Sequence, residues 1–464
     1  MPALVILLAG QAMVSMDVSI LVVATPSLAT DLHVSPGELQ LVVAAYTVAF
    51  GALVVTGSRL GDVLGRRRAF LAGLAAFTTC SLAGGLAPDP EALIGARALQ
   101  GTAAALMTPQ VLSIIQVEVD GERRTRAIGA YSMILAVGVA AGQVLGGVLV
   151  SAHVVGAAWR PALLINAPVG AILLAAGRRC LPRTAPLAAA RLDLGGAALL
   201  STAMAALIVP LTLGREAGWP AWASVSLAAS AVAAAAFVAH ERRVRAGGRR
   251  PLLALELLRV PGVGAGIGAV LLVMSCYAGF LLSLTLHLQD GLRFSALHSG
   301  LVFAAYACGF AAASLSWGRV PPSAQPGLPV IGPLAMGAAL LAVGVIADGG
   351  GWPPVATTAL LVLAGAGHAC GFSPVTHRVT AMVGSDHASD ASGLILTASL
   401  VGQVLGVAAF AGVYLDAVKA GSPDALGITT GALAGALTVS AVLGWCVARA
   451  WRSPEVGRRP RAWP

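Results

Sequence analysis

One acidic residue, Asp17, lies near the middle of an apolar stretch that covers residues 3–29. A carboxylate at the centre of a lipid bilayer costs roughly 3 kcal/mol, so such a residue is a candidate for chemistry. Burial in hydrocarbon favours the neutral carboxyl group, whereas a nearby cation favours the ionised one. A carboxyl group held between these influences can bind and release a proton. The alternative is a structural acid that hydrogen-bonds to neighbouring helices.

A second apolar stretch, residues 92–117, contains Arg97, Gln100 and Gln110, which we interpret as a polar stripe. Lipid disfavours such side chains, so the stripe is expected to face a cavity inside the protein. For Arg97, the alternative is a snorkelling side chain at the membrane surface. At a rise of about 1.5 Å per residue, Arg97 is expected to lie about 8 to 10 Å nearer the outer surface than Asp17. This offset predicts a water-bridged or state-dependent interaction rather than a permanent salt bridge.

A charged cluster, "GSRLGDVLGRRRAF", connects two further apolar stretches. Asp62 and three arginines from Arg66 to Arg68 are expected to fill the connection, with Gly61 and Gly65 allowing a tight turn. An acid among bases can exchange ion pairs, and so can latch one arrangement of the helices and release another. The alternative is an ordinary positively charged loop on the cytoplasmic side.

Several other residues are candidates for packing or for lining a substrate cavity. Gly138, Gly142 and Gly146 are four residues apart, which predicts a flat helix face that another helix can approach closely. A plain packing role is the alternative to a gating role. Scattered polar groups in a mostly apolar cavity suit a bulky lipophilic ligand. The candidates for such a cavity are Tyr46, Gln100, Tyr131, Asn166, Tyr277, Tyr306, His368 and Gln403.

His368 is the main ionisable candidate within the apolar stretches of the second half, which we interpret as having no buried acid. A lone histidine in such a place is more often a hydrogen-bonded core residue than a functional group.

Composition indicates the environment that must position these residues. The chain has 464 residues, of which 57% are hydrophobic and 11% are charged, whereas soluble domains carry about 25% charged residues. This is an integral membrane protein. The net charge of +9 comes from basic clusters between apolar stretches, a pattern typical of cytoplasmic loops that argues against nucleic-acid binding. The six cysteines form no CxxC pair and are interpreted as small core residues rather than disulfides or metal ligands.

Fourteen stretches are long enough to span a membrane as helices, which predicts an all-α polytopic fold. The first is interpreted as a retained span, since a signal peptide would need a basic start and a shorter apolar run. The predicted spans cover residues 3–29, 39–60, 69–86, 92–117, 127–150, 161–176, 192–213, 221–239, 263–288, 296–317, 327–347, 355–375, 391–415 and 426–448.

The basic residues set the orientation of these spans, because Lys and Arg favour the cytoplasmic side. With both termini in the cytoplasm, all of them fall at cytoplasmic ends except Arg97, Arg160, Arg215, Arg293 and Lys419. Arginine greatly outnumbers lysine, and alanine and glycine are abundant. This usage is typical of a GC-rich genome and indicates a bacterial source.

A short repeat suggests two related halves. "GQVLGG" at residues 142–147 returns as "GQVLGV" at residues 402–407. Parallel repeats of this kind occur in secondary transporters, which hold substrate between the halves. The predicted organisation is a six-helix half at 1–177, two inserted helices at 178–259, a second six-helix half at 260–448 and a basic tail at 449–464.

The residues described above resemble motifs of the major facilitator superfamily, specifically of its 14-span drug–proton antiporters. The resemblance extends along the whole chain. The charged connection matches the superfamily signature at Arg59, Leu60, Asp62, Gly65, Arg66 and Arg67, with Ser58 in place of a glycine and Val63 in place of a base. Other matches lie in the first, fourth, fifth and sixth spans, at Asp17, Ala24, Pro26, Arg97, Gln100, Gly101, Gly138, Gly142, Gly146, Gly147, Trp159, Arg160, Asn166, Pro168 and Gly170. Gln143 replaces the proline of the fifth-span signature, which puts the kink of that helix in doubt.

The resemblance implies a monomeric cell-membrane exporter that exchanges small lipophilic, drug-like or antibiotic-like molecules for protons and needs no cofactor other than the proton gradient. Asp17 would carry the proton, and Arg97 would modulate the charge of Asp17. The Asp62 cluster and the helix that contains Gly138 would control which side of the membrane the cavity opens to. The first alternative is an importer or uniporter without proton exchange. A membrane enzyme would need clustered catalytic side chains at one membrane face, and a sensor would need soluble domains; neither feature is found in the sequence.

Overall fold

The computed structural model describes residues 2–34, 36–151, 159–182, 192–214, 218–247, 251–383 and 387–452. Helices and their connections account for these residues, and none of them forms a strand. The chain divides into two compact units. The first unit comprises Met1–Glu118, Ile134–Ala254 and Ser392–Thr397, and the second comprises Val119–Met133, Leu255–Ala391 and Ala398–Pro464.

Nine helices supply the first unit, and one of them, α5, also contributes its first turns to the second unit. Prolines stand at the starts of several helices, where a missing N–H costs no hydrogen bond. The helices are α1 (Pro2–Asp31), α2 (Pro36–Leu64), α3 (Arg66–Gly85), α4 (Pro90–Glu118), α5 (Gly121–Ser151), α6 (Arg160–Leu164), α7 (Asn166–Cys180), α8 (Leu194–Leu213) and α9 (Ala221–Ala246).

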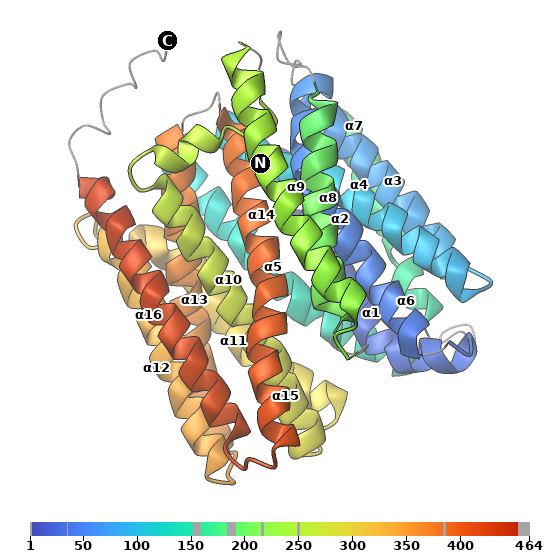
Figure 1. Cartoon of the computed structure of the whole chain (residues 1–464), viewed down its shortest axis with the longest axis vertical. Coiled ribbons are helices and arrows are strands. Elements are labelled where there is room, and N and C mark those ends of the chain that lie inside the picture. Colours follow the sequence, from blue (N-terminus) through green and yellow to red (C-terminus); the bar gives the residue numbers. More distant parts are fainter. Residues whose placement is uncertain are drawn as a thin grey trace. The chain divides into compact units, whose positions relative to one another are not determined.

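The second unit contains the remaining helices, among which α14 contributes one segment to the first unit. Within it, α12 packs against both α13 and α16, and these helices lie side by side in Figure 1. A turn of π-helix at His287–Gly291 extends α10, and a second one at Val407–Ala411 joins α14 to α15. The helices are α10 (Val263–Leu286), α11 (Ala296–Ser316), α12 (Leu328–Asp348), α13 (Pro354–Val383), α14 (Ala388–Gly406), α15 (Gly412–Lys419) and α16 (Ala425–Arg452).

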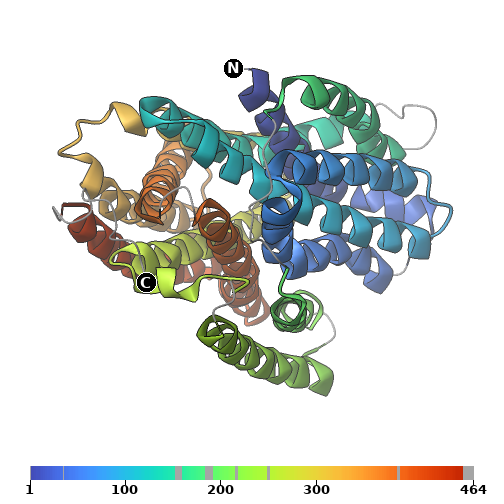
Figure 2. The same cartoon turned by 90° about the horizontal axis from the view of Figure 1, so that it is seen from above.

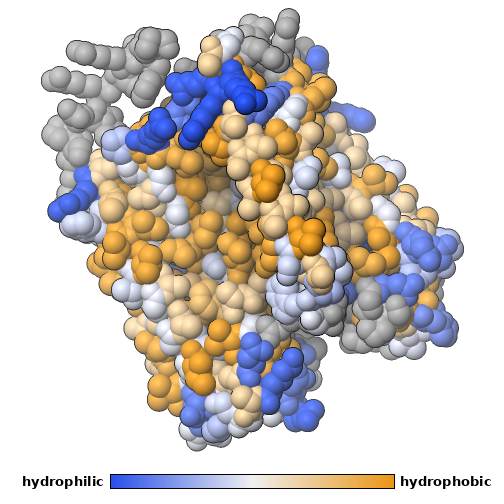
Figure 3. Space-filling model, viewed as in Figure 1, coloured by the Kyte–Doolittle hydropathy of each residue, from blue (hydrophilic) through white to orange (hydrophobic). Residues whose placement is uncertain are grey.

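Thirteen helical segments among the described residues are long and apolar enough to cross a membrane. They coincide with thirteen of the fourteen predicted spans. The sixth predicted span, 161–176, corresponds to the segment Arg160–Cys180, which α6 and α7 form together. The remaining predicted span, 69–86, is also a helix, α3, but it begins with three arginines and is more polar than the others. Apolar residues cover most of the face seen in Figure 3, with hydrophilic residues gathered at its ends.

The inserted helices α8 and α9 form an antiparallel pair attached to the first unit. They pack against each other, and α8 also packs against α2; the pair appears in green in Figure 2. Side-chain donors reinforce the contact with α2, since Gln40 donates to the Thr212 carbonyl at 2.9 Å and Ser201 to the Ala52 carbonyl at 2.8 Å. Such hydrogen bonds satisfy polar groups that lipid would leave unpaired.

Candidate functional site

Asp17 and Arg97 form a direct ion pair inside the first unit. The Arg97 NH1 atom lies 2.6 Å from Asp17 Oδ2, and the two side chains are 2% and 0% exposed. The expectation of a water-bridged contact is therefore wrong for this structure, as is that of a snorkelling arginine. The predicted offset along the membrane normal overlooked the long arginine stem, which lets the guanidinium group reach a carboxylate at another depth.

Two amide side chains complete the environment of Asp17. Gln100 Nε2 donates to Asp17 Oδ1 at 2.9 Å, while Gln100 Oε1 accepts from Arg97 at 2.7 Å. Asn166 Nδ2 donates to the same Asp17 oxygen at 2.7 Å and to Ser81 Oγ at 2.9 Å. Helices α1, α3, α4 and α7 thus contribute to one network. Arg97, Gln100 and Asn166 thus all donate to the carboxylate.

Tyr46 of α2 covers the other side of the arginine. The Arg97 guanidinium carbon lies 4.5 Å from the centre of the Tyr46 ring, a cation–π contact. The Tyr46 side chain is buried, and among the described residues its hydroxyl group has no hydrogen-bond partner. Tyr46 therefore joins the Asp17 network through its ring rather than through its hydroxyl group.

The predicted polar stripe on α4 is divided by the structure. Arg97 and Gln100 hold Asp17, but Gln110 Nε2 donates to the Gly57 carbonyl of α2 at 2.8 Å. The interpretation of one stripe was wrong, because thirteen residues at about 100° per residue place Arg97 and Gln110 on different helix faces. None of the three side chains contacts lipid, because Arg97, Gln100 and Gln110 are all buried inside the protein.

The charged cluster at the α2–α3 junction is not a loop. Helix α2 continues to Leu64 and α3 begins at Arg66, so the connection is Gly65 alone. Gly65 has a φ of 87°, a conformation that glycine adopts without strain. The predicted longer connection was wrong, because Asp62 lies within the last turn of α2. Gly61 is also helical, and a Cβ atom there would lie 2.0 Å from Gln110 Oε1.

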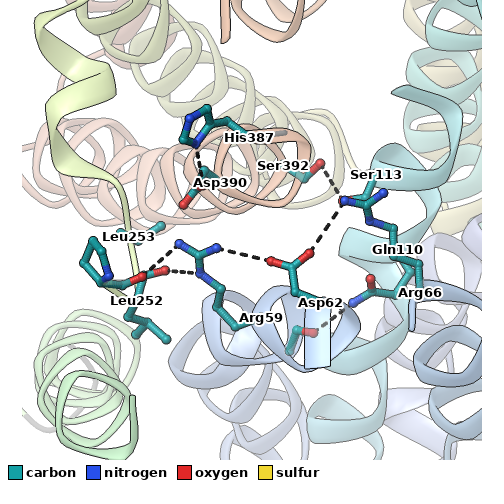
Figure 4. A network of polar contacts seen from close by, with 12 residues as sticks. Arg59, Asp62, Arg66, Gln110, Ser113, Leu252, Leu253, His387, Asp390 and Ser392 are labelled. Atoms are coloured by element: carbon teal, nitrogen blue, oxygen red, sulfur yellow. Dashed lines mark hydrogen bonds and ion pairs between the residues drawn. The ribbon is translucent and has the colours of Figure 1, made fainter. Parts of the chain in front are cut away.

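Asp62 is buried between two arginines, as Figure 4 shows. Its Oδ2 atom lies 3.2 Å from Arg59 NH1 and its Oδ1 atom lies 3.6 Å from Arg66 NH2. Arg67 instead donates to the carbonyl of Arg178 near the end of α7. The cluster therefore holds one acid between two cationic partners, each of which faces a different carboxylate oxygen.

Arg59 also binds the backbone that follows the inserted helices. Its guanidinium group donates to the Leu252 carbonyl and, at 3.0 Å, to the Pro251 carbonyl. Glu241, at the end of α9, accepts from the Leu252 and Leu253 amides at 3.2 and 2.9 Å. The segment is thus held on both its carbonyl and its amide groups. Glu241 is a site residue that was not predicted, although an acid among the arginines near the end of α9 was a signal for it.

A pair of serines adds a further contact to this region. Ser113 of α4 donates to Ser392 Oγ at 3.0 Å, and Ser392 belongs to the segment of α14 that is part of the first unit (Figure 4). Nothing in the sequence indicated this pair, because isolated serines in apolar helices are common.

The glycines of α5 pack closely against α1, as expected from their spacing. A Cβ atom on Gly138 would lie 2.6 Å from Ser15 Cβ, and one on Gly142 would lie 2.6 Å from the Met16 carbonyl. Gly146 is buried on the same helix. Gln143 and Gly147 belong to α5, but their surroundings lie outside the described part of the structure. The close packing is confirmed, and the gating role stays a prediction.

We expect Gly142→Ala to reduce transport and to lower the free energy of unfolding by about 1 to 3 kcal/mol, because the added methyl group meets the α1 backbone. Gly95→Ala is the matched control, since Gly95 is also helical and a Cβ atom there has no neighbour within 4 Å. That control should be neutral or stabilising by up to about 1 kcal/mol. Denaturant titration and transport assays of both variants check this. Equal effects of the two substitutions would contradict a close α1–α5 contact.

The other cavity candidates are distributed over the second unit. Tyr277, Tyr306 and His368 form one aromatic group, in which the Tyr306 hydroxyl lies 2.8 Å from His368 Nδ1. Tyr131 is buried, and its hydroxyl has no partner among the described residues. Gln403 donates to the Ser399 carbonyl of its own helix at 3.2 Å.

The expectation that the second half has no buried acid is wrong. Asp390 is 1% exposed, and its Oδ2 atom lies 3.2 Å from His387 Nδ1. Helix α14 begins at Ala388, before the predicted span at 391–415, so Asp390 lies in the buried first turn of the helix.

A bundle of apolar helices that encloses a buried ion pair is the architecture of a polytopic membrane protein. Residues 7–407 match the Major Facilitator Superfamily. The chain therefore belongs to the major facilitator superfamily, and it is a transporter rather than an enzyme.

Relatives and solved structures agree with this assignment. The chain is 37% identical over 416 residues to the cephamycin export protein CmcT of Amycolatopsis lactamdurans, covering 88% of this chain and 83% of that protein. It is 35% identical over 455 residues to the puromycin resistance protein pur8 of Streptomyces alboniger, covering 97% and 87%. The crystal structure of the human organic anion transporter MFSD10 shares the fold, with a TM-score of 0.68 at 16% identity over 96% of this chain and 99% of that one.

Proposed function

We propose that this protein exports lipophilic, antibiotic-like molecules from the cell in exchange for protons, with Asp17 as the proton carrier. The observation that supports the proposal is a fully buried carboxylate held by one guanidinium group and two amides. The names of the relatives support the direction, since one is an export protein and the other a resistance protein. The carrier works as a monomer with both termini in the cytoplasm and needs no cofactor besides the proton gradient.

Protonation of Asp17 changes the charge balance of the site. The neutral carboxyl group no longer attracts Arg97, which keeps its contacts with Gln100 and with the ring of Tyr46. A buried cation without its counter-ion is costly, so proton uptake favours a rearrangement of α1 and α4. Alternating access follows when that rearrangement opens one face of the bundle and closes the other.

The Asp62 cluster and the segment at Pro251 to Leu253 then act as the latch. Asp62 can exchange between Arg59 and Arg66, and Arg59 also holds the segment that leads from the inserted helices to the second unit. A change at either ion pair therefore alters how firmly this segment is attached to α2.

Transport by reconstituted vesicles tests the proposal. Purified protein is placed in liposomes with an acidic interior, and uptake of puromycin is followed together with the interior pH. Because puromycin is a weak base that acidic vesicles accumulate unaided, the uptake that counts is the excess over vesicles without protein. We expect this excess to require the gradient, to be accompanied by an additional loss of interior protons and to stop when a protonophore is added. Uptake that is indifferent to the gradient would instead indicate a uniporter and overturn proton exchange.

A further inference from the structure

His368 is a buried polar side chain that the proton-exchange mechanism does not use. It lies midway along α13, in the second unit, and is 2% exposed. Its Nδ1 atom lies 2.8 Å from the Tyr306 hydroxyl, whereas its Nε2 atom is buried without a hydrogen-bond partner among the described residues. Unpaired polar groups at membrane depth are costly, so each one calls for an explanation.

The hydrogen bond to Tyr306 indicates which ring nitrogen carries the proton. If Tyr306 accepted from Nδ1, its own hydroxyl hydrogen would lack an acceptor, and the Nε2 lone pair would also be unpaired. If Tyr306 donates to Nδ1, the Nε2–H group is the one donor left without a partner. The second arrangement leaves fewer groups unsatisfied, so the site presents an N–H donor.

Aromatic rings surround this donor. The centre of the His368 ring lies 4.6 Å from that of Phe310, 5.0 Å from that of Tyr277 and 6.3 Å from that of Phe372. Phe310, Phe372 and Tyr306 are buried, whereas Tyr277 is only partly buried. Tyr277 is therefore the member of this aromatic group that keeps some exposed surface.

We propose that His368 is a specificity-determining residue whose Nε2–H group binds an acceptor oxygen of a flat aromatic substrate. The aromatic neighbours favour a planar ring system, which stacks offset or edge-on against them. The N–H group favours a carbonyl oxygen on that ring system, because such an oxygen accepts its hydrogen bond. The inference rests on the proposed export function and defines its substrate class as aromatic carbonyl compounds.

Two probes with and without ring carbonyl oxygens test this assignment, and the variants at position 368 separate the hydrogen bond from differences in ring stacking. Anthraquinone-2-sulfonate and anthracene-2-sulfonate share a three-ring skeleton and a charged group, but only the first has ring carbonyl oxygens. Binding of each is measured by fluorescence or calorimetry on the purified full-length protein in detergent, without a proton gradient. We expect the wild type to bind the quinone more tightly than the hydrocarbon by about tenfold, the value of one buried hydrogen bond.

Substitutions at position 368 show whether this residue supplies the preference. His368→Phe keeps an aromatic ring and deletes the N–H group, so the ratio of the two affinities should fall to about one. His368→Gln keeps an N–H donor and should restore part of the ratio. Because a ratio is independent of the fraction of folded protein, a partly unfolded variant still gives an answer. An unchanged ratio in His368→Phe, equal binding of both probes by the wild type, or no binding of either would overturn the proposal.

The readout separates this inference from the proposed function. If vesicles show no gradient-driven puromycin uptake but the affinity ratio still depends on His368, proton-coupled export fails and the binding site stands. If uptake is gradient-driven but the affinity ratio is unchanged in His368→Phe, the proposed binding site is overturned and proton-coupled export is still supported.

Discussion

Asp17→Asn is expected to abolish gradient-driven uptake of puromycin and the accompanying loss of protons. Asparagine keeps the size and the hydrogen-bonding oxygen of the side chain but cannot bind and release a proton. Arg97 and Gln100 would still have a partner at position 17, so the local structure should persist. The measurement is uptake and interior pH in acid-loaded vesicles, with an expected reduction of at least about a hundredfold, typical of losing a proton-transfer group.

Controls on the same helix make this result specific. Asp31 is also on α1, but its side chain is 46% exposed and it accepts a hydrogen bond from Trp159 Nε1 at 2.7 Å. Asp31→Asn should therefore retain proton-coupled uptake. Asp17→Glu retains a titratable group in an altered position and should keep part of the activity. Protonophore-sensitive uptake by Asp17→Asn at the wild-type rate would show that another group carries the proton.

Arg97→Leu is expected to cost about 3 to 5 kcal/mol of unfolding free energy, because it leaves a buried carboxylate without its counter-ion. The double variant Asp17→Asn/Arg97→Leu removes both charges and should be less destabilised than the sum of its single variants. The coupling energy from this cycle is expected to be roughly 2 kcal/mol or more. Denaturant titration in mixed micelles of the wild type, both single variants and the double variant measures it.

An exposed ion pair provides the matched comparison. Arg126 and Glu122 on α5 lie 2.7 Å apart, close to the Asp17–Arg97 distance, but their side chains are 72% and 77% exposed. Arg126→Leu should cost less than about 1 kcal/mol because water screens such pairs. If the cycle at Asp17 and Arg97 gave a coupling as small as that of the exposed pair, the two groups would not form a buried ion pair in the folded protein.

Much of the fold could be predicted from the sequence because apolar length is a local property. Thirteen helical segments coincide with predicted spans, and the close packing of Gly138 and Gly142 follows from their spacing. Helix boundaries were harder to predict. Charged residues near Gly65 suggested a loop, but a single residue with a positive φ suffices for the turn, and the charges satisfy one another within the helices.

The candidate site shows the same division between local and tertiary information. Asp17, Arg97, Gln100, Tyr46 and Asn166 were each recognisable as polar residues in apolar helices. Three of them contact the Asp17 carboxylate and Tyr46 contacts Arg97. These contacts depend on how four helices pack and on the reach of one arginine, which no spacing along the chain encodes.

By itself the sequence determined a polytopic helical membrane protein, its family resemblance and the residues able to do chemistry, because hydropathy and residue type need no neighbours to be read. Only the tertiary structure decided that Asp17 and Arg97 touch, that Gln110 contacts α2 instead, and that Glu241 and Arg59 hold the segment after α9. It also decided that one His368 nitrogen has no partner within the described part of the chain. The physical reason is that hydrogen bonds and ion pairs form over about 3 Å, and contacts at that scale between distant residues are set by how whole helices pack.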